Sequence, residues 1–325
     1  MNSLTFSILH QLANGQFHSG EALAKQFNVS RATIWNAIQY AQSLGIEIFS
    51  VRGRGYKLPK AISLLDKTQI LQAIGVEREW FHIEVLDEVV STNTYLMKAA
   101  TSGAPHASCV VAHIQTNGRG RRGRLWVSHL GASLTFSLLW RFDCGAAALS
   151  GLSLAIGVGL IRALNELGVI SVQLKWPNDV LVGNKKLAGI LIDLQGDLDG
   201  PSAAVIGVGI NINLPEHIKK SIDQPVIDLS QLGANHIDQN KLLGTVLKHF
   251  ANVLKQFEQS RFVGIRDEWL SYHAYHLQPV RLLMPDGRYI DGEVTDVADD
   301  GILLVNTAYG VQRFSAGEIS LRSIA

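Results

Sequence analysis

A glycine- and arginine-rich segment at residues 115–126 has the composition of an anion-binding loop. It reads Gln-Thr-Asn-Gly-Arg-Gly-Arg-Arg-Gly-Arg-Leu-Trp, with four arginines among three glycines. A guanidinium group grips carboxylate or phosphate oxygens in pairs, and glycine lets a backbone approach a ligand closely. We expect this segment, the arginine loop, to close over such an anion and to be mobile without one. A solvated basic loop or a nucleic-acid patch is the alternative interpretation.

The elements around the arginine loop exclude two common phosphate-binding motifs. Residues 118–123 match G-x-G-x-x-G, a dinucleotide fingerprint that needs a strand before it and a helix after it. Residues 109–114 predict the strand, but apolar residues alternate from 134 to 140 and predict another strand instead of a helix. No Gly-Lys-Ser/Thr ends the segment, so it is not a Walker loop either.

A predicted hairpin brings a lysine near an aspartate. Gly183-Asn184 fits a two-residue turn between strands. This register pairs Lys186 with Leu181 and Asp179 with Ala188, so that Asp179 and Lys186 become diagonal neighbours about 7–8 Å apart at the backbone. A lysine side chain spans that distance. Lysines more often keep an edge strand soluble, but a Lys–Asp pair beside small residues is less easily explained in that way.

Further polar and small residues stand at the ends of predicted elements. Ser91-Thr92-Asn93-Thr94 follows a predicted strand at 83–90 and precedes a helix at 95–100, so these residues could cap the helix or bind a polar ligand. A strand is predicted at 203–213, where Gly207 and Gly209 share a face that Asn211 continues. Glycines weaken a strand unless something must approach it closely.

The first 60 residues predict a winged helix-turn-helix. Helices are expected at 4–13, after a Ser19 cap, and after a Ser30 cap with its end at Gly45. Strands at 46–49 and 56–58 would form a hairpin with a basic tip. A three-helix protein-interaction module is the alternative, but the basic wing favours DNA. The residues expected to contact DNA are Ser30, Arg31, Thr33, Trp35, Asn36, Gln39, Arg52 and Arg54.

The remaining patterns complete an α+β chain of several domains. Helices are expected at 66–74 and 149–167 around a central mixed sheet, and short strands at 280–284, 289–297, 302–305 and 311–314 would close into a small barrel. The expected domains are a winged helix-turn-helix at 1–62, a central domain at 66–272 and a C-terminal domain at 273–325.

Charge and composition argue against a membrane-spanning, secreted or disulfide-rich protein. The net charge is +1, but residues 1–60 carry an excess of four positive charges. The two cysteines, Cys109 and Cys144, have no spacing typical of a disulfide framework or a zinc site. The longest apolar run, 151–161, is too short to span a membrane, and no basic region precedes an apolar stretch at the N-terminus. We therefore expect a reduced, cytoplasmic protein with no membrane partner and no metal held by its own side chains.

Taken together, these segments resemble the bifunctional biotin–protein ligase and biotin operon repressor of bacteria. The resemblance covers the whole chain, and its pieces occur in the order and at the spacing of the family. The matching segments are Ser91-Thr92-Asn93, Gly-Arg-Gly-Arg-Arg-Gly at 118–123, Lys-Trp-Pro-Asn-Asp at 175–179, Lys-Leu-Ala-Gly-Ile-Leu at 186–191, Gly-Ile-Asn at 209–211 and Gly-Glu-Ile-Ser-Leu-Arg at 317–322.

The resemblance implies a central fold related to class II aminoacyl-tRNA synthetases and lipoate ligases, an SH3-like C-terminal barrel, and a two-step adenylation. Biotin and Mg²⁺-bound ATP would give biotinyl-5′-AMP, and a lysine of the biotin carboxyl carrier protein would then take the biotinyl group. The protein would also dimerise with biotinyl-AMP bound and repress the biotin operon by binding operator DNA.

The resemblance also implies roles for individual residues. Lys186, Arg121 and Asp179 would be catalytic. The residues implied for biotin are Ser91, Thr92, Asn93, Gln115, Arg119, Gly120, Arg121, Lys186, Gly207 and Gly209. Those implied for the nucleotide are Arg121, Arg124, Trp126, Lys175, Asn178 and Asn211, with Trp126 and Asn211 facing the adenine.

Three alternatives stay open at this stage. A repressor that senses a metabolite without catalysis would not need Lys186, Asp179 and Arg121 together. A lipoate ligase shares the implied fold but does not usually carry a winged helix or this arginine loop. A ligase with a vestigial winged helix is the third, because Trp35 stands where a polar residue is expected on the recognition helix.

Overall fold

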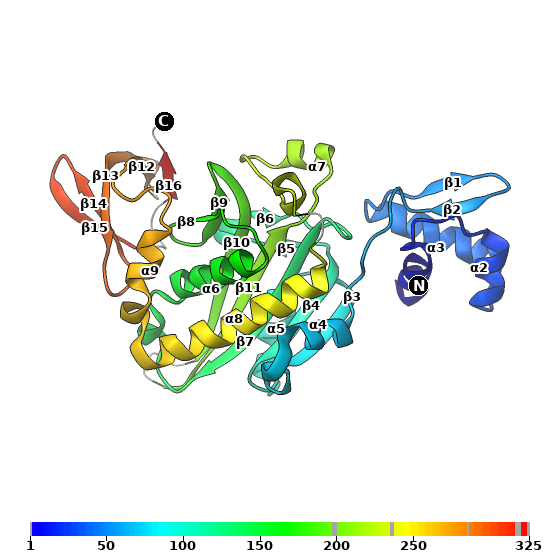
Figure 1. The fold of residues 1–325 in the computed structure, drawn as a ribbon, viewed down its shortest axis with the longest axis horizontal. Helices are drawn as coiled ribbons and strands as arrows, with labels where there is room; N and C mark the ends of the chain where they lie inside the picture. Colours follow the sequence, from blue (N-terminus) through cyan, green and yellow to red (C-terminus); the bar gives the residue numbers. More distant parts are fainter. Residues whose placement is uncertain (1, 197–199, 235–236, 285, 316–319, 324–325) are drawn as a thin grey trace.

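The chain folds into three units in sequence order, a helical N-terminal unit, a central sheet flanked by helices and a small C-terminal sheet (Figure 1). The computed structural model describes residues 2–196, 200–234, 237–284, 286–315 and 320–323. The three units match the predicted α+β class with a helix-turn-helix at its start.

The N-terminal unit has three helices followed by a hairpin: α1 (Asn2–Leu12), α2 (Gly20–Gln26), α3 (Arg31–Ser43), β1 (Phe49–Val51) and β2 (Gly55–Lys57). Ser19 and Ser30 cap α2 and α3 as predicted, because each side chain accepts a hydrogen bond from a backbone N–H of the first turn, at 3.0 and 3.1 Å. The strand predicted at 46–49 was wrong. Ile46 and Ile48 are buried in the core of this unit, and β1 begins only at Phe49.

The central sheet has seven strands in the order β3-β4-β7-β11-β10-β9-β8. Strands β3 and β4 are parallel, and every other neighbouring pair is antiparallel, which confirms a mixed sheet. The strands are β3 (His82–Val89), β4 (Ser108–Gln115), β7 (Ser133–Phe142), β8 (Gln173–Lys175), β9 (Asp179–Val182), β10 (Lys185–Gly196) and β11 (Ser202–Asn211).

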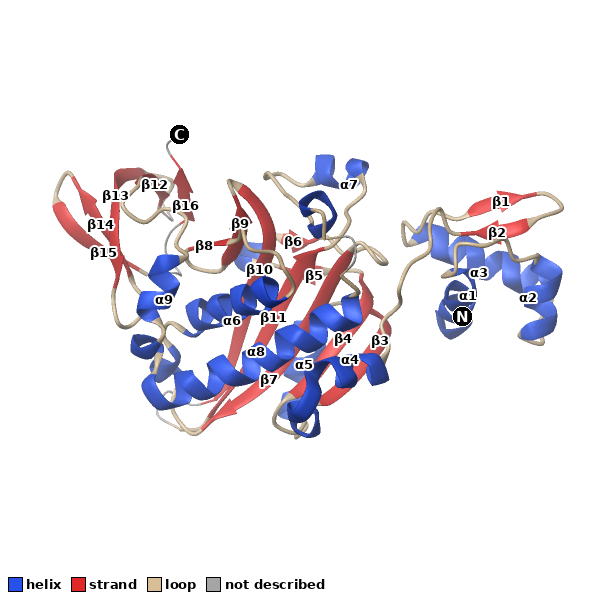
Figure 2. Ribbon diagram, viewed as in Figure 1, coloured by secondary structure: helices blue, strands red, loops and turns tan. Residues whose placement is uncertain are grey.

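Helices cover both faces of this sheet (Figure 2). One face packs on α4 (Lys67–Ile74), α6 (Leu152–Glu166) and α8 (Gln239–Ser260), and the other on α5 (Thr92–Thr101). Neighbouring residues of β7 separate the two layers, since Leu138 belongs to the first core and Leu139 to the second. Two short helices, α7 (Glu216–Ser221) and α9 (Arg266–Ser271), complete the central unit.

The helix predicted at 149–167 is interrupted near its start. A short 3₁₀ segment, Ala146–Leu149, precedes α6, and Gly151 separates the two with a φ of 81°. A side chain at Gly151 would also collide with Phe262, since its Cβ would lie 2.7 Å from the Phe262 Cβ. The stretch 146–166 is long and apolar enough to cross a membrane by length and composition, but 67% of its most apolar window is buried inside the fold. That is typical of the core helix of a globular domain.

The C-terminal unit is an antiparallel sheet in the order β15-β14-β13-β12-β16. Its strands are β12 (Pro279–Leu283), β13 (Tyr289–Val297), β14 (Leu303–Thr307), β15 (Gly310–Phe314) and β16 (Ser320–Ser323). Residues 317–319 of the expected Gly-Glu-Ile-Ser-Leu-Arg motif lie outside the described residues. Val280 and Val305 share one continuous core with the central helices, and the Trp176 indole donates a hydrogen bond to the Gly301 carbonyl at 3.0 Å. The C-terminal unit is therefore packed against the central unit and contacts the turn that joins β8 to β9.

Candidate active site

The start of α5 and the inner strands of the sheet form a polar pocket. Its walls come from α5, β4, the arginine loop, β7, β10 and β11. The predicted biotin residues that line it are Ser91, Thr92, Asn93, Gln115, Arg119, Gly207 and Gly209. The fold brings these seven residues together around one pocket, although they are spread over more than a hundred positions.

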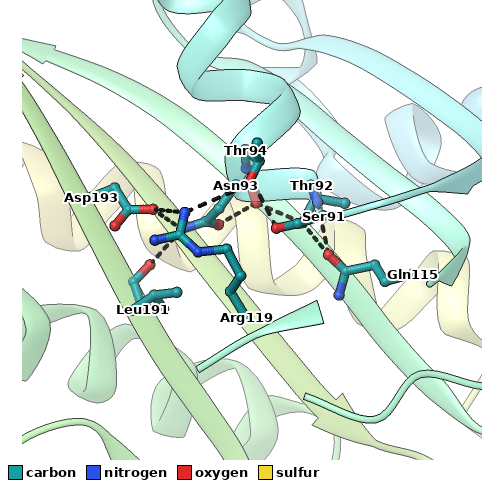
Figure 3. Close-up of polar contacts among 9 residues, drawn as sticks. Ser91, Thr92, Asn93, Thr94, Gln115, Arg119, Leu191 and Asp193 are labelled. Atoms are coloured by element: carbon teal, nitrogen blue, oxygen red, sulfur yellow. Dashed lines mark hydrogen bonds and ion pairs between the residues drawn. The ribbon is translucent and has the colours of Figure 1, made fainter. Parts of the chain in front are cut away.

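A hydrogen-bond network fixes the polar end of this pocket (Figure 3). The Thr92 backbone N–H and hydroxyl both donate to Gln115 Oε1, at 2.7 and 3.1 Å. Ser137 Oγ lies 2.7 Å from Thr92 Oγ1 and 2.6 Å from Asn93 Oδ1. Ser91 caps α5 by accepting from the Thr94 N–H. Capping and ligand binding were alternative interpretations of residues 91–94, and the structure combines a helix cap with side chains that face the pocket.

Asp193 is a pocket-side residue that the sequence reasoning missed. Its Oδ2 accepts hydrogen bonds from Arg119 Nη1 and from Asn93 Nδ2, each at 3.2 Å (Figure 3). Asp193 lies on β10 four residues after Gly189, with Leu191 between them, so the three share one face of the strand. Gly189 was not among the predicted site residues, and a β-bulge lies between Lys186 and Ala188, so alternation along the strand gave no starting point for identifying Asp193.

Two side chains fill the spaces beside the glycines of β11. A Cβ at Gly207 would lie 2.0 Å from Asn93 Oδ1, and a Cβ at Gly209 would lie 2.2 Å from the Trp126 indole. This explains the glycines as sites of close approach, as the strand pattern suggested. The open space in the pocket is only about 30 Å³, whereas ligand pockets are roughly 300–1,000 Å³. A ligand must therefore displace the indole and the arginine loop that carries it.

A second hollow of about 400 Å³ lies against the first, with Trp126 between them. It is rich in positive charge, and the predicted residues that line it are Gly120, Arg121, Arg124, Trp126, Lys175, Asn178, Asp179 and Lys186. The Arg121 guanidinium donates to Asn178 Oδ1 at 3.0 Å, and Asn178 is held in turn by the Ile190 carbonyl at 2.7 Å. Burial and then the neighbouring Arg122 lower the pKa of Arg121, while Asp179 raises it. The hollow is electrostatically suited to phosphates.

Lys186 and Asp179 form an ion pair on the wall of the second hollow, where Lys186 lies next to Gly189 of the first hollow. Lys186 Nζ lies 2.7 Å from Asp179 Oδ1, and both side chains are largely buried, with 15% and 16% exposed. The register predicted for this hairpin is correct for the pairs beside the turn and wrong further along the two strands. A β-bulge between Lys186 and Ala188 pairs Asp179 with Gly189 instead of Ala188. The lysine side chain nevertheless reaches the aspartate, and it also lies 5.7 Å from the Trp126 ring centre.

Asn211 does not line either hollow. Its side chain is 4% exposed and donates hydrogen bonds to the backbone carbonyls of Lys186 and Ile227, at 3.2 and 3.1 Å. The expectation that Asn211 faces an adenine therefore differs from its position here. Its amide donates a hydrogen bond to the backbone carbonyl of Lys186 and so helps to fix the strand that carries the ion-paired lysine.

The N-terminal unit exposes a second candidate surface. On α3, Arg31, Trp35, Asn36 and Gln39 are exposed, whereas Thr33 is half-buried and shares the Ser30 cap through a 2.9 Å hydroxyl contact. Arg52 and Arg54 are exposed at the hairpin tip, where the Arg54 guanidinium lies 4.6 Å from the Phe17 ring centre. Trp35 is 54% exposed, as expected. The outer face of α3 and the hairpin tip thus have the character of a recognition helix and a basic wing.

Comparisons with known proteins agree with the three units. The model of the Biotin/lipoate A/B protein ligase family matches residues 85–211, an HTH domain model matches 5–57, and the biotin protein ligase C-terminal domain matches 278–322. The biotin protein ligase from Aquifex aeolicus in complex with biotin and ATP is similar in structure, with a TM-score of 0.64, 31% identity, and coverage of 74% of this chain and 99% of that one. The fold is that of a biotin or lipoate ligase.

Two relatives match this chain over almost its whole length. The bifunctional ligase/repressor BirA of Escherichia coli (strain K12) is 36% identical over 322 residues, which is 99% of this chain and 98% of that protein. The bifunctional ligase/repressor BirA of Bacillus subtilis (strain 168) is 29% identical and covers 96% of both chains. The chain belongs to the family of bifunctional ligase/repressors.

Proposed function

We propose that this protein attaches biotin to a lysine of a biotin carboxyl carrier protein and represses transcription when its biotinyl-AMP intermediate accumulates. The observation that carries the catalytic half is the Lys186–Asp179 ion pair at the junction of the two hollows. A cation held there would touch both a carboxylate in the first hollow and a phosphate in the second. In this proposal the protein acts in the cytoplasm. Its DNA-binding domain is residues 1–62, its catalytic domain is residues 66–272, and its C-terminal domain is residues 273–325.

In this proposal Lys186 and Arg121 bring two anions together. The biotin carboxylate oxygen attacks the α-phosphorus of ATP, the bond to the bridging oxygen breaks, and pyrophosphate leaves. The acceptor lysine amine then attacks the acyl carbon, and AMP leaves. Neither step needs a protein nucleophile, so positioned positive charge supplies the catalysis. Asp179 holds Lys186 in place, and Arg119, Arg121 and Arg124 cover the intermediate.

We propose that Mg²⁺ enters on the phosphates of ATP. Asp179 and Asp223 are the carboxylates among the residues that line the second hollow, and Asp179 is already paired with Lys186. Cationic side chains outnumber these carboxylates in the hollow, so the ion's remaining ligands would be phosphate oxygens and water, as is usual for magnesium. The ion would neutralise phosphate charge, and Arg121 and Lys186 would orient the reacting groups.

One experiment tests the catalytic half directly. The protein is incubated with ATP, labelled biotin and a biotin-acceptor domain, with lipoate in place of biotin as the control. We expect label on the acceptor lysine with biotin and none with lipoate. Transfer of lipoate in preference to biotin would favour the lipoate ligase, and no transfer of either would favour a repressor without catalysis.

The arginine loop should become protected from protease when biotin and ATP bind. Its four arginines repel one another, and Trp126 must leave Gly209 before a ligand can enter. Bound carboxylate and phosphate would compensate the charge and order the loop. Trypsin cleavage within residues 115–126 should therefore slow when both ligands are present, and cleavage at Lys60 serves as the control. Equal cleavage of the loop with and without ligands would contradict this.

Asp193→Asn should weaken biotin binding modestly and leave ATP binding unchanged. Asp193 holds Arg119 and Asn93 at the polar pocket, but Arg119 is 49% exposed, so solvent screens the pair. Exposed ion pairs contribute about 0.2–1 kcal/mol, which corresponds to at most about a fivefold rise in the KM for biotin. Asp296→Asn, on the C-terminal sheet, is the matched control. An equal change in the KM for ATP would show that Asp193 acts through general stability.

A further inference from the structure

Three possible metal ligands meet where the N-terminal unit packs on the central sheet. They are His10 on α1, Asp87 on β3 and His113 on β4, and their ligand atoms all lie within 4.8 Å of one another. The two strands are parallel neighbours, with Leu86 opposite Ala112 and Glu88 opposite Ile114. Asp87 and His113 are therefore side by side on one face of the sheet, and α1 supplies the third group from another unit.

The imidazole of His113 is buried where the N-terminal unit meets the central sheet. Its side chain is 4% exposed, yet neither ring nitrogen has a hydrogen-bond partner among the described residues. Its ring stacks on Phe6 at 6.0 Å and meets the edge of the His10 ring at 5.8 Å. The ring of His113 is therefore held between two aromatic neighbours, with His10 next to it.

The charges at this cluster also suit a cation. Burial and the nearby His10 lower the pKa of His113 to about 4, so its imidazole is neutral at pH 7 and has a lone pair to donate. Burial raises the pKa of Asp87, and its carboxylate has no ion-pair partner among the described side chains. Two imidazoles and one carboxylate form a donor set that binds divalent transition metals and suits zinc or cobalt.

We propose that His10, Asp87 and His113 bind one divalent transition-metal ion that joins the N-terminal unit to the central sheet. Donor atoms of a tetrahedral zinc site lie roughly 3.4 Å apart, given metal–ligand distances of about 2.0–2.2 Å. The cluster must therefore contract, which rotation of the exposed His10 side chain allows. A fourth position would be left for water. The sequence did not predict this site, because its three residues have no motif spacing.

The proposed site would influence the orientation of the DNA-binding unit. Contacts between the units near it include a 2.7 Å hydrogen bond from the Tyr40 hydroxyl to Glu88 and the burial of Ile114 in the core of the N-terminal unit. A bond to metal from each unit would add a rigid link beside those contacts. His113 is also two residues from Gln115, which holds Thr92 in the polar pocket, so the link joins the strand that reaches the ligand site.

Cobalt titration of the full-length, chelator-treated protein tests the proposal in the absence of ATP. We expect one Co²⁺ per chain, with the visible absorption of a tetrahedral site. His10→Ala and Asp87→Asn should each weaken binding by at least about tenfold, since even loss of a residue that only supports a ligand costs about 10–100-fold. His82→Ala is the matched control, because His82 is exposed at the other end of β3.

A second readout separates a link between units from metal bound elsewhere. Zn²⁺ should slow trypsin cleavage after the exposed Lys60 between the units, and it should not do so in His10→Ala. Circular dichroism checks that both variants fold; His10 is exposed and Asn is isosteric with Asp. The proposal fails if the protein shows no saturable cobalt binding at micromolar concentrations. It also fails if His10→Ala and Asp87→Asn bind cobalt like the wild type, or if zinc slows cleavage equally in His10→Ala.

Discussion

Lys186→Ala should reduce the rate of biotinyl-AMP formation by about 10²-fold or more, the loss typical of removing one preorganised charge from a transition state. Its ammonium group is largely buried, 2.7 Å from Asp179, at the junction of the two hollows. The adjacent Lys185 cannot replace it, because Lys185 is exposed on the other face of β10. Pyrophosphate release in single-turnover experiments measures the effect, and Lys185→Ala should retain the wild-type rate.

A loss of activity in Lys186→Ala could also arise from instability, because the substitution leaves a buried carboxylate without its cation. An unpaired buried group costs about 1–3 kcal/mol or more. The double variant Asp179→Asn with Lys186→Ala removes that cost and should recover stability in urea unfolding while remaining inactive. If the double variant regained activity, or if Lys186→Ala formed the adenylate at the normal rate, Lys186 would have no part in the chemistry.

Local patterns were sufficient to predict most of the elements that carry the site. Serine caps preceded α2, α3 and α5, and period-two alternation identified β7 and β11. Errors occurred where tertiary packing overrides a local signal. Ile46 and Ile48 alternate like a strand, but both are used in the core of the N-terminal unit. The helix predicted at 149–167 is interrupted at Gly151, where the φ is positive and the backbone lies so close to Phe262 that a Cβ would collide with it.

The sequence predicted which residues meet at the two hollows better than it predicted how their side chains are arranged. Gly207 and Gly209 signalled close approach, yet only the structure identifies Asn93 and Trp126 as the groups that approach. The β-bulge after Lys186 shifts the register by one residue, and no turn signal specifies it. The resemblance implied that Asn211 faces an adenine, whereas in the structure its amide donates hydrogen bonds to two backbone carbonyls.

Residues that act across distant parts of the chain were beyond the reach of spacing arguments. Asp193 is linked to Arg119 across 74 positions, and His10 meets His113 only after two units have packed together. Such contacts depend on how the units dock, which periodicity does not encode. By contrast, the recognition face of α3 and the basic wing are local features, and the sequence predicted both.

Operator affinity should fall steeply with salt, and Arg52→Ala with Arg54→Ala should make that dependence shallower. Each phosphate contact contributes about 0.9 to the slope of log K against log salt, and six to ten contacts cost about 10³–10⁵ in affinity between 50 and 200 mM salt. Arg31, Arg52, Arg54 and Lys57 surround the exposed outer face of α3 and the hairpin tip. Losing the two wing arginines should lower the slope by about 1.8 per bound chain.

The same variant should transfer biotin at the wild-type rate, because the wing is in a different unit from the polar pocket (Figure 1). Lys67→Ala with Lys98→Ala removes two exposed charges from the central unit and should leave the salt slope unchanged. Biotin and ATP should tighten operator binding, because the adenylate is proposed to promote the dimer, and allosteric couplings are typically about 5–150-fold. Linkage makes this coupling reciprocal, so operator DNA should retain the adenylate more tightly by the same factor. If biotin and ATP leave operator affinity unchanged, the repressor half of the proposal fails, and a ligase with a vestigial winged helix remains.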